Sequence, residues 1–387
     1  MGLAACSAPA DPGPGRGEDA TEATGPTCAD QVRTACRSVT VGTRTIRFVT
    51  SPGAPGATAT LVDLGGPGVP APTATQLGAM RSRLPSSIRS NRLIALEEPW
   101  VTREVDARCA DALSARYERI RGGRRDEPLP VVEACGLGTP GGWGFRPDEY
   151  AAAVGAVEKR TGSRVTSFVG ASFASQRLSY LSGLGRLQGI WLSHPFPTGL
   201  DAARYLGARQ LAAEHHWARA YEAKQPLPRT FTDQSAILAA AYLPAKEIAS
   251  LSTLRSSARH ERLRTLSDGL WQVFGTASVS PAILAYYDEM CPALQDWPGV
   301  ESSRARTGLM GTYHEICSDV MQARRTTAAG PVPVPTVRAT CVVVSRTDAV
   351  VPRALLKGSD LVERADHLVY DDADHQDMGD LNQCAAR

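Results

Sequence analysis

The chain has 387 residues, of which 43% are hydrophobic and 21% charged. This globular composition leaves room for one large α/β domain carrying an insertion, or for two ordinary domains. The formal net charge of +2 comes from scattered basic residues that nearly as many acids balance, so we expect no nucleic-acid partner. No run of about 18 apolar residues occurs, which excludes a membrane-spanning helix and leaves a protein that is soluble or merely tethered.

The N-terminal segment resembles the start of a lipoprotein. Leu3 to Cys6 has the form of a bacterial lipobox, in which the cysteine is lipidated, although Met1-Gly2 supplies neither the basic segment nor the apolar core of a signal. Ser7 to Thr27 is rich in Ala, Pro, Gly, Asp and Thr without apolar periodicity, a composition typical of a disordered tether. We therefore expect residues 1–27 to be a truncated signal and linker, with Cys6 as the lipidation candidate. An ordinary disordered N-terminus is the alternative.

Cysteine usage points to an oxidising compartment. Nine cysteines occur, and the eight that remain when Cys6 is set aside form an even set that suits disulfides. There is no C-x-x-C pair and no Cys/His cluster with zinc-ligand spacing, so we expect no metal. Sequential pairing is the preferred connectivity. The alternative is that several are buried free thiols, of which Cys341, inside an apolar strand, is the first candidate. The eight cysteines are Cys28, Cys36, Cys109, Cys135, Cys291, Cys317, Cys341 and Cys384.

Strands alternate with helices over the first half of the chain, which indicates a parallel sheet. The predicted elements are a hairpin over 37–51, strands over 57–64 and 92–97, helices over 106–121 and 147–161, a strand from 165, a helix over 173–184 and a strand over 189–193.

Helical patterning alone follows, from Phe196 to about Arg325. Its clearest segments are 200–223, 235–254 and 263–274. Strands return over 337–344 and 367–370. We therefore expect a helical cap, over 196–325, between the two parts of an α/β core, over 28–195 and 326–387.

The stretch from Val165 to Ser175 combines a short β-branched and aromatic strand, a Gly-x-Ser turn at Ser172, and helix-forming residues. It has the form of a nucleophile elbow, in which a tight strand-to-helix turn holds a serine hydroxyl out of the sheet. Gly170 and Ala174 stand where the G-x-S-x-G pattern has its glycines. A strand that simply ends in a turn is the alternative, so the assignment depends on partners for Ser172.

A glycine-rich turn, Gly65-Gly66-Pro67-Gly68, follows an early predicted strand. Backbone N–H groups in such a turn come close to a ligand because no Cβ intervenes, but the Gly-Lys-Ser/Thr ending of a phosphate-binding loop is missing. Acyl transfer needs two N–H donors directed at the developing oxyanion. We expect Gly65 or Gly66, together with Phe173, to supply them; a plain turn is the alternative.

Three residues suited to acyl transfer each lie just past the end of a predicted strand. Their order is Ser172, Asp348 and then His375, the order found in α/β-hydrolases. Residues at the carboxyl ends of parallel strands converge even when they are far apart in sequence. Asp371 and Asp374 are alternative acids, and a solvated surface histidine is the alternative interpretation of His375.

At these residues the chain resembles the proline iminopeptidase and tripeptidyl aminopeptidase branch of the α/β-hydrolases, from about residue 28 to the C-terminus. The matching pieces are Gly65-Gly66-Pro67-Gly68 for the H-G-G-P-G loop, the elbow at Ser172, the acid turn Asp348-x-x-x-Pro352, and His375 followed by Cys384. Leu64 replaces the histidine of the family loop, and Glu97-Glu98-Pro99-Trp100 replaces its D-x-R-G turn. These departures put the substrate class in doubt more than the triad.

The resemblance implies an α/β-hydrolase fold, a mostly parallel sheet flanked by helices, with the cap inserted between the strand after the elbow helix and the acid-bearing strand. It also implies a mechanism without a cofactor. Ser172 attacks a carbonyl carbon, His375 takes and returns the proton, and Asp348 orients the imidazole.

We expect a secreted or lipid-anchored, monomeric serine peptidase that acts on peptide N-termini and meets a membrane only through its anchor. Glu97, Glu98 and Trp100 are the candidates for substrate binding. The acids available to pair with a substrate amine are Glu97, Glu98, Glu214, Glu222, Asp288 and Glu289. An esterase with the same triad and a non-catalytic binding lipoprotein are the alternatives, and the sequence does not choose the substrate.

Overall fold

A computed structural model describes residues 36–51, 58–123, 130–197, 199–221, 230–274, 278–297, 300, 304–325, 339–357 and 359–385. The expectations for the signal and linker over 1–27, including Cys6, and those for Cys28 and Glu222 concern residues outside these ranges. Within the described part of the chain, no helix is both long and apolar enough to cross a membrane.

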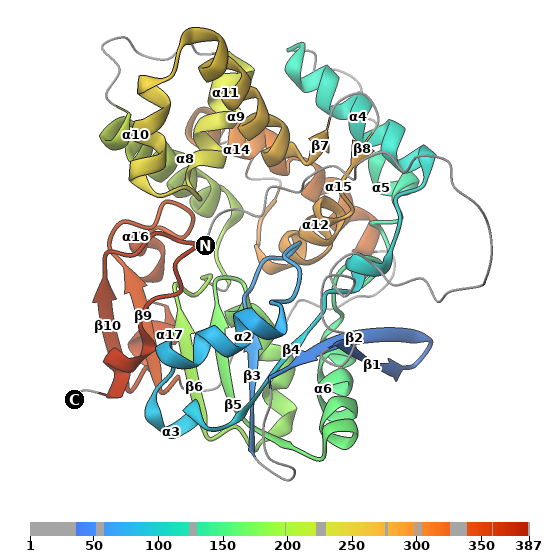
Figure 1. Ribbon diagram of the computed structural model, residues 1–387. Coiled ribbons are helices and arrows are strands. Elements are labelled where there is room, and N and C mark those ends of the chain that lie inside the picture. Colours follow the sequence, from blue (N-terminus) through green and yellow to red (C-terminus); the bar gives the residue numbers. More distant parts are fainter. Residues whose placement is uncertain are drawn as a thin grey trace, which may run out of the picture.

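An eight-stranded sheet in the order β1-β2-β4-β3-β5-β6-β9-β10 forms the centre of the molecule (Figure 1). The strands are β1 (Cys36–Val41), β2 (Arg44–Thr50), β3 (Thr58–Asp63), β4 (Arg92–Leu96), β5 (Arg164–Ala171), β6 (Gly189–Ser193), β9 (Cys341–Ser345) and β10 (His367–Asp371). β1 and β2 form the predicted hairpin around Gly42, and β2 also runs antiparallel to β4. All the other pairings are parallel.

Helices cover both faces of the sheet, and the side chains of β5 alternate between them. Val169 packs in a cluster with residues of α2 (Ala74–Met80), α3 (Ser86–Arg89) and the 3-10 helix η4 (Leu381–Ala385). Its neighbour Phe168 points to the opposite face, where the cluster includes residues of α6 (Pro147–Thr161). This alternation is the two-residue period of a strand that is buried on both sides.

The helix after the elbow strand is shorter than the sequence predicts. Instead of one helix over 173–184, α7 (Ala174–Leu178) continues as the 3-10 helix η3 (Ser179–Leu184). The remaining short elements around the sheet are η1 (Arg81–Arg83), η2 (Pro99–Thr102), α16 (Arg353–Leu356) and α17 (Asp360–Glu363).

A second layer of helices lies beyond one end of the sheet (Figure 1). It consists of α8 (Ala202–Ala220), α9 (Phe231–Ala240), α10 (Ala245–Thr253), α11 (Ser256–Trp271), α12 (Ala282–Ala293), α14 (Arg304–His314) and α15 (Ile316–Arg325), with the two-stranded pair β7 (Val273–Phe274) and β8 (Ser278–Val279). The prediction of one helix over 235–254 is wrong, because the chain turns at Leu243 and Pro244 and starts a new helix there. Proline lacks the N–H that an interior helical position needs.

An earlier segment adds to this helical layer. α4 (Ala107–Arg121) and α5 (Val131–Ala134) contact β8 and α15, respectively. The layer is therefore assembled from two insertions, of which the sequence indicated only the one over 196–325. The term cap below means α8 to α15, with α4 and α5.

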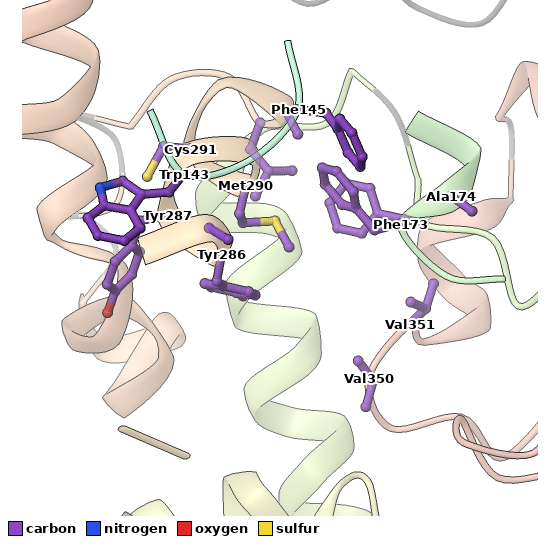
Figure 2. Packing of buried hydrophobic residues seen from close by; sticks show 14 of the residues in the cluster. Trp143, Phe145, Phe173, Ala174, Tyr286, Tyr287, Met290, Cys291, Val350 and Val351 are labelled. Carbon is purple, nitrogen blue, oxygen red and sulfur yellow. The ribbon is translucent and has the colours of Figure 1, made fainter. Parts of the chain in front are cut away.

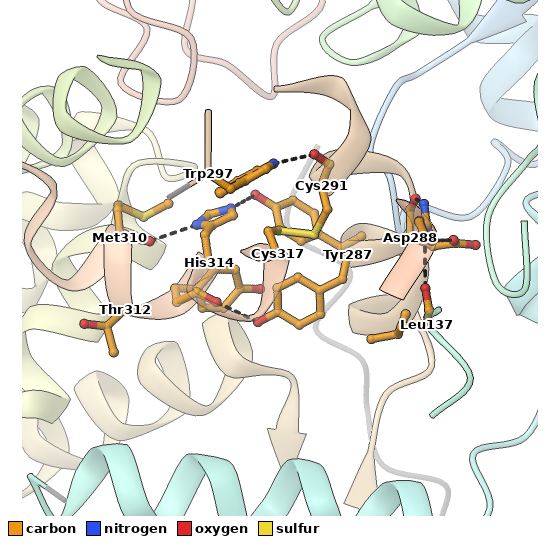
Figure 3. The surroundings of a disulfide bond; sticks show 12 residues. Leu137, Tyr287, Asp288, Cys291, Trp297, Met310, Thr312, His314 and Cys317 are labelled. Atoms are coloured by element: carbon orange, nitrogen blue, oxygen red, sulfur yellow. Dashed lines mark hydrogen bonds and ion pairs between the residues drawn. A yellow bond between two sulfur atoms is a disulfide. The ribbon is translucent and has the colours of Figure 1, made fainter. Parts of the chain in front are cut away.

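Three disulfides follow the predicted sequential pairing, namely Cys109–Cys135, Cys291–Cys317 and Cys341–Cys384. The alternative in which Cys341 is a buried free thiol does not hold, because the last 3-10 helix brings Cys384 against β9. The second disulfide joins α12 to α15 in the middle of the cap (Figure 3). The side chain of Cys36 and its expected partner Cys28 lie outside the described part.

The strand order, the antiparallel β2 and the sharp turn after β5 together define an α/β-hydrolase fold, as predicted. In such an open sheet, residues that follow the carboxyl ends of β3, β5, β6, β9 and β10 gather at one edge. The candidate site lies at this edge.

Candidate active site

Ser172 occupies the turn between β5 and α7 with a φ of 51°, in the left-handed region that non-glycine residues rarely adopt. Small neighbours make this turn feasible, because a Cβ on Gly170 would lie 2.9 Å from the Cβ of Ala174. Backbone bonds fix the turn on both sides: Ser172 N–H donates to the carbonyl of Ser193, and Phe196 N–H donates to the carbonyl of Ser172. Residue 172 thus has the strained geometry of a nucleophile elbow.

The structure brings Ser172, His375 and Asp348 together. His375 Nε2 lies 3.0 Å from Ser172 Oγ, and His375 Nδ1 lies 2.7 Å from Asp348 Oδ2. If Nδ1 carries the proton that Asp348 accepts, Nε2 is the acceptor for the serine hydroxyl. This is the arrangement of a nucleophile, a base and an orienting acid.

Asp348 is buried and anchored by the start of the following turn. Its Oδ1 accepts hydrogen bonds from the N–H groups of Val350 and Val351. Burial by itself would raise the pKa of Asp348, but His375 and the Val351 N–H outweigh it and hold the pKa below the ordinary value. The carboxylate is therefore ionised at neutral pH and able to stabilise an imidazolium.

A second histidine, which the sequence did not indicate, lies beside the triad. His194 follows β6 with a φ of 47°, and its ring centroid is 6.3 Å from that of His375. Its Nε2 is 3.3 Å from Asp371 Oδ1, so one of the two alternative acids already has a different histidine partner. The only available signal was its position, after the strand next to β5, at the edge where the site forms.

Metal ligation at this site would compete with the triad. One ligand atom from each of His194, Asp348 and His375 lies within 4.8 Å of the other two. Two of these residues, however, are hydrogen-bonded to each other. A metal ion held by the three would therefore have to break the contact that orients His375.

The glycine-rich turn passes directly over the elbow. A Cβ on Gly65 would lie 2.3 Å from the carbonyl oxygen of Ala171 and 2.8 Å from the nitrogen of Phe173, so only glycine fits there. The N–H of Gly65 donates to Asp63 Oδ1, which removes it from the expected oxyanion donors. The N–H groups of Gly66 and Phe173 have no acceptor among the described residues and remain the candidates.

One buried arginine, Arg177 of α7, bonds to this turn. Its guanidinium donates to the carbonyl oxygen of Gly65 and bonds the carboxylates of Asp63, Glu98 and Glu289. Two of these acids in turn accept backbone N–H groups of the loop: Asp63 from Gly65, and Glu98 from Gly68. Arg177 and its three carboxylates, called the Arg177 cluster below, therefore fix the main chain of the oxyanion candidates.

Charge in the Arg177 cluster is tightly balanced. Burial alone would lower the pKa of Arg177, but the carboxylates raise it well above its ordinary value. Burial raises the pKa of Glu289 to about 7, against the pull of Arg177 and with the repulsion of Glu98. The pKa of Glu98 is raised as well, again chiefly by burial. Three carboxylates around one cation leave an excess of negative charge, and a proton on Glu289 reduces it.

The structure gives the expected substrate-binding acids other roles. Glu98 is 3% exposed and accepts from Arg177, the Gly68 N–H and the indole of Trp100. Glu97 is 2% exposed and accepts the N–H of Ala71. Buried carboxylates satisfied in this way support loops rather than face a substrate. Trp100 is half-buried, and its indole N–H is used in the hydrogen bond to Glu98.

Asp288 and Glu289, the two acidic candidates on α12, are also bonded to other parts of the protein. Asp288 accepts the N–H groups of Trp143 and Gly144 and pairs with Arg324, while Glu289 belongs to the Arg177 cluster. Glu214, exposed on α8, accepts from Gln210. The sequence could not reveal the roles of Asp288 and Glu289, because their partners are distant in the chain.

The cap contributes aromatic side chains next to the triad. The ring of Tyr242, in the turn between α9 and α10, meets the ring of His375 edge-on, with centroids 5.8 Å apart. From α12, Tyr286 and Met290 lie in the same buried cluster as Phe173 and Val350 of the core (Figure 2). The cap therefore reaches the residues that carry the triad.

Comparison with known proteins adds structural neighbours only. No family model and no curated protein matches this sequence. A proline iminopeptidase-related protein from Thermus thermophilus is 15% identical with a TM-score of 0.37, over 90% of this chain and 93% of that one. An acetylester hydrolase from Corynebacterium glutamicum is 12% identical with a TM-score of 0.37, over 86% and 83%.

Epoxide Hydrolase A from Mycobacterium thermoresistibile is 15% identical with a TM-score of 0.36, over 91% of this chain and 96% of that one. The three neighbours are α/β-hydrolases or related proteins of differing chemistry. Since identities and TM-scores are this low, we base the fold on the strand order and the elbow of this chain itself.

Proposed function

We propose that this protein is a serine hydrolase that cleaves carboxylic acid derivatives through an acyl-enzyme. The contact between Ser172 Oγ and His375 Nε2, at 3.0 Å, carries the proposal. Ser172 attacks the carbonyl carbon as His375 takes its proton, and Asp348 stabilises the imidazolium. The N–H groups of Gly66 and Phe173 bind the developing oxyanion. His375 returns the proton to the leaving group, and water then releases the acid by the reverse steps.

Of the two substrate classes, carboxylic esters have the better support. Release of residues from a peptide N-terminus requires an acid that faces the substrate amine. Glu97 and Glu98, the leading candidates, are buried and bonded to backbone or to Arg177. An ester substrate has no amine and requires no such acid. Three disulfides are compatible with an oxidising compartment, and we keep a secreted or lipid-anchored location as part of the proposal.

Labelling and kinetics of a Ser172→Ala variant test the proposal. A fluorophosphonate probe should label the wild type and leave the variant unlabelled, and the variant should lose at least about a thousandfold in ester hydrolysis because the nucleophile is gone. Acyl esters and aminoacyl arylamides in the same assay separate esterase from aminopeptidase activity. A wild type that neither takes the label nor turns over any ester would instead support a non-catalytic binding protein.

A further inference from the structure

In the part of the chain that the structure describes, four arginines are almost completely buried, and one of them differs from the rest in its charged neighbours. Among the described residues, Arg116, Arg177 and Arg324 each have a carboxylate within 4.0 Å. Arg209 of α8, which is 3% exposed, has none among the residues that the structure describes. A buried charge without a counter-ion is costly, so proteins keep one mainly where a ligand or a mechanism uses it.

Hydroxyl groups surround Arg209. Its guanidinium donates to the hydroxyl of Tyr242 at 2.6 Å and to that of Tyr286 at 3.2 Å, and Tyr205 lies within hydrogen-bonding reach. Burial raises the pKa of Tyr205 to about 12 and that of Tyr286 well above its ordinary value. At neutral pH the hydroxyls of Tyr205 and Tyr286 are therefore uncharged. They solvate the guanidinium without neutralising it.

The direction of the hydrogen bonds can be followed from His314. Its Nδ1 faces the carbonyl oxygen of Met310 (Figure 3), so Nδ1 carries the proton and Nε2 is an acceptor. Burial lowers the pKa of His314 to about 3, which keeps this neutral form. The hydroxyl of Tyr286 therefore donates to His314 Nε2, and its oxygen accepts from Arg209. The single hydroxyl proton of Tyr286 is therefore already donated to His314 and is not available to a ligand.

Tyr242 differs from Tyr286 at this point. Its oxygen accepts from Arg209, but its own O–H has no acceptor among the described residues. The residue is only half-buried, and its ring meets that of His375 with centroids 5.8 Å apart. A free donor, polarised by a buried cation, therefore lies beside the catalytic histidine.

We propose that Arg209 and Tyr242 form a binding site for a carboxylate of the substrate, so that the enzyme prefers esters that carry a second, free carboxyl group. This inference rests on the proposed hydrolase function. The carboxylate accepts the O–H of Tyr242 and supplies the negative charge that Arg209 lacks, while the ester carbonyl lies at Ser172. The reaction is unchanged: water is added across the ester bond, and an acid and an alcohol leave.

Two pairs of isosteric esters test the proposal, one for each side of the scissile bond. On the acyl side, mono-4-nitrophenyl adipate is compared with 4-nitrophenyl adipamate. On the leaving-group side, 3-acetoxybenzoate is compared with 3-acetoxybenzamide. In at least one pair the wild type should show a kcat/KM about tenfold or more in favour of the carboxylate, the size expected for a charge-assisted hydrogen bond in a buried site.

Variants then assign the preference to the site. In Arg209→Met and in Tyr242→Phe the ratio within that pair should fall to near one, whatever happens to the absolute rates. Arg209→Lys should retain part of the preference. Arg204→Met is the matched control, because Arg204 is an exposed arginine on the same helix and its loss changes the net charge equally. Its ratio should match that of the wild type.

A wild-type enzyme with no preference for the carboxylate in either pair would overturn the inference, and this result does not depend on any variant folding. A preference that survives Arg209→Met would overturn it as well. Either outcome is distinct from failure of the proposed function, which would appear as neutral esters hydrolysed equally by the wild type and by Ser172→Ala.

Discussion

Two buried arginines, one in the core and one in the cap, have opposite surroundings. Arg177 bonds three carboxylates, with Nε 2.7 Å from Glu289 Oε2 and Nη2 2.6 Å from Glu98 Oε1. Within the described ranges of the chain, Arg209 bonds only hydroxyls. The carboxylates around Arg177 neutralise its charge, and the cluster fixes the loop over the elbow. The hydroxyls around Arg209 leave its positive charge without a described counter-ion, close to His375. This difference separates a structural ion cluster from a candidate ligand site.

Helix α12 connects the two centres. Tyr286, in its first half, accepts from Arg209, and Glu289, three residues later, bonds Arg177. Cys291 then joins the same helix to α15. We therefore expect substitutions at Arg177, at Arg209 and in α12 to differ in their effects on stability and on ester hydrolysis.

The largest expected effect on stability is that of Arg177→Met. Removing the cation leaves the carboxylates of Asp63, Glu98 and Glu289 buried without the counter-ion that they share, which should lower the free energy of unfolding by about 3 to 5 kcal/mol. Arg209→Met removes an arginine of similar burial but strands no carboxylate, so its cost should be on the order of 1 kcal/mol. Urea unfolding of both variants at pH 7 measures the contrast. Equal losses would mean that the two centres do not differ as described.

The two cap disulfides allow a matched comparison, since each closes a separation of 26 residues. Replacing either pair by alanine should cost about 3 kcal/mol. Only the loss of Cys291–Cys317 should also alter ester hydrolysis, because α12 contacts both arginines. Thermal unfolding and kcat/KM of the C291A/C317A and C109A/C135A variants provide the test. Identical kinetics in the two variants would argue against α12 as the connecting element.

The smallest expected effect is a change in pH dependence. The pKa of Glu289 is raised to about 7, so the folded protein keeps a proton that the unfolded chain loses near pH 4.5. The stability from this proton is complete below that pH and is lost as the pH rises through 7. Between pH 5 and pH 8 the wild type should therefore lose more stability than Glu289→Gln, by about 1 kcal/mol or more. Parallel pH profiles from urea unfolding would contradict the raised pKa.

The sequence was informative where chemistry depends on local order along a strand and its following turn. The elbow at Ser172 could be predicted from its neighbours, and the positions of Asp348 and His375 from the convergence of parallel strands at one edge. Sequential cysteine pairing reflects short loops. The position of Cys341 inside an apolar strand kept a buried free thiol as the alternative, because the path of the last residues to Cys384 depends on packing.

Contacts between distant segments could not be predicted. Arg177 and Glu289 are 112 residues apart, so nothing local signalled that Glu98 and Glu289 serve a common cation. The same holds for Arg209 and Tyr242, 33 residues apart on different cap elements. The family resemblance called for an acid that binds a substrate amine. Of the acids available for that role, the fold uses Glu97, Glu98, Asp288 and Glu289 internally.

The positions of the three disulfides have a consequence for recombination. Cys291–Cys317 lies wholly within 196–325, and the other two lie wholly outside it. A chimera in which 196–325 is exchanged for the equivalent segment of a distant homologue would therefore sever none of them. It would, however, remove Glu289 from Arg177. It would also remove Asp288 from the N–H groups of Trp143 and Gly144. Grafts that supply acids at both positions should therefore be accepted best, so the limit on shuffling this segment is electrostatic rather than covalent.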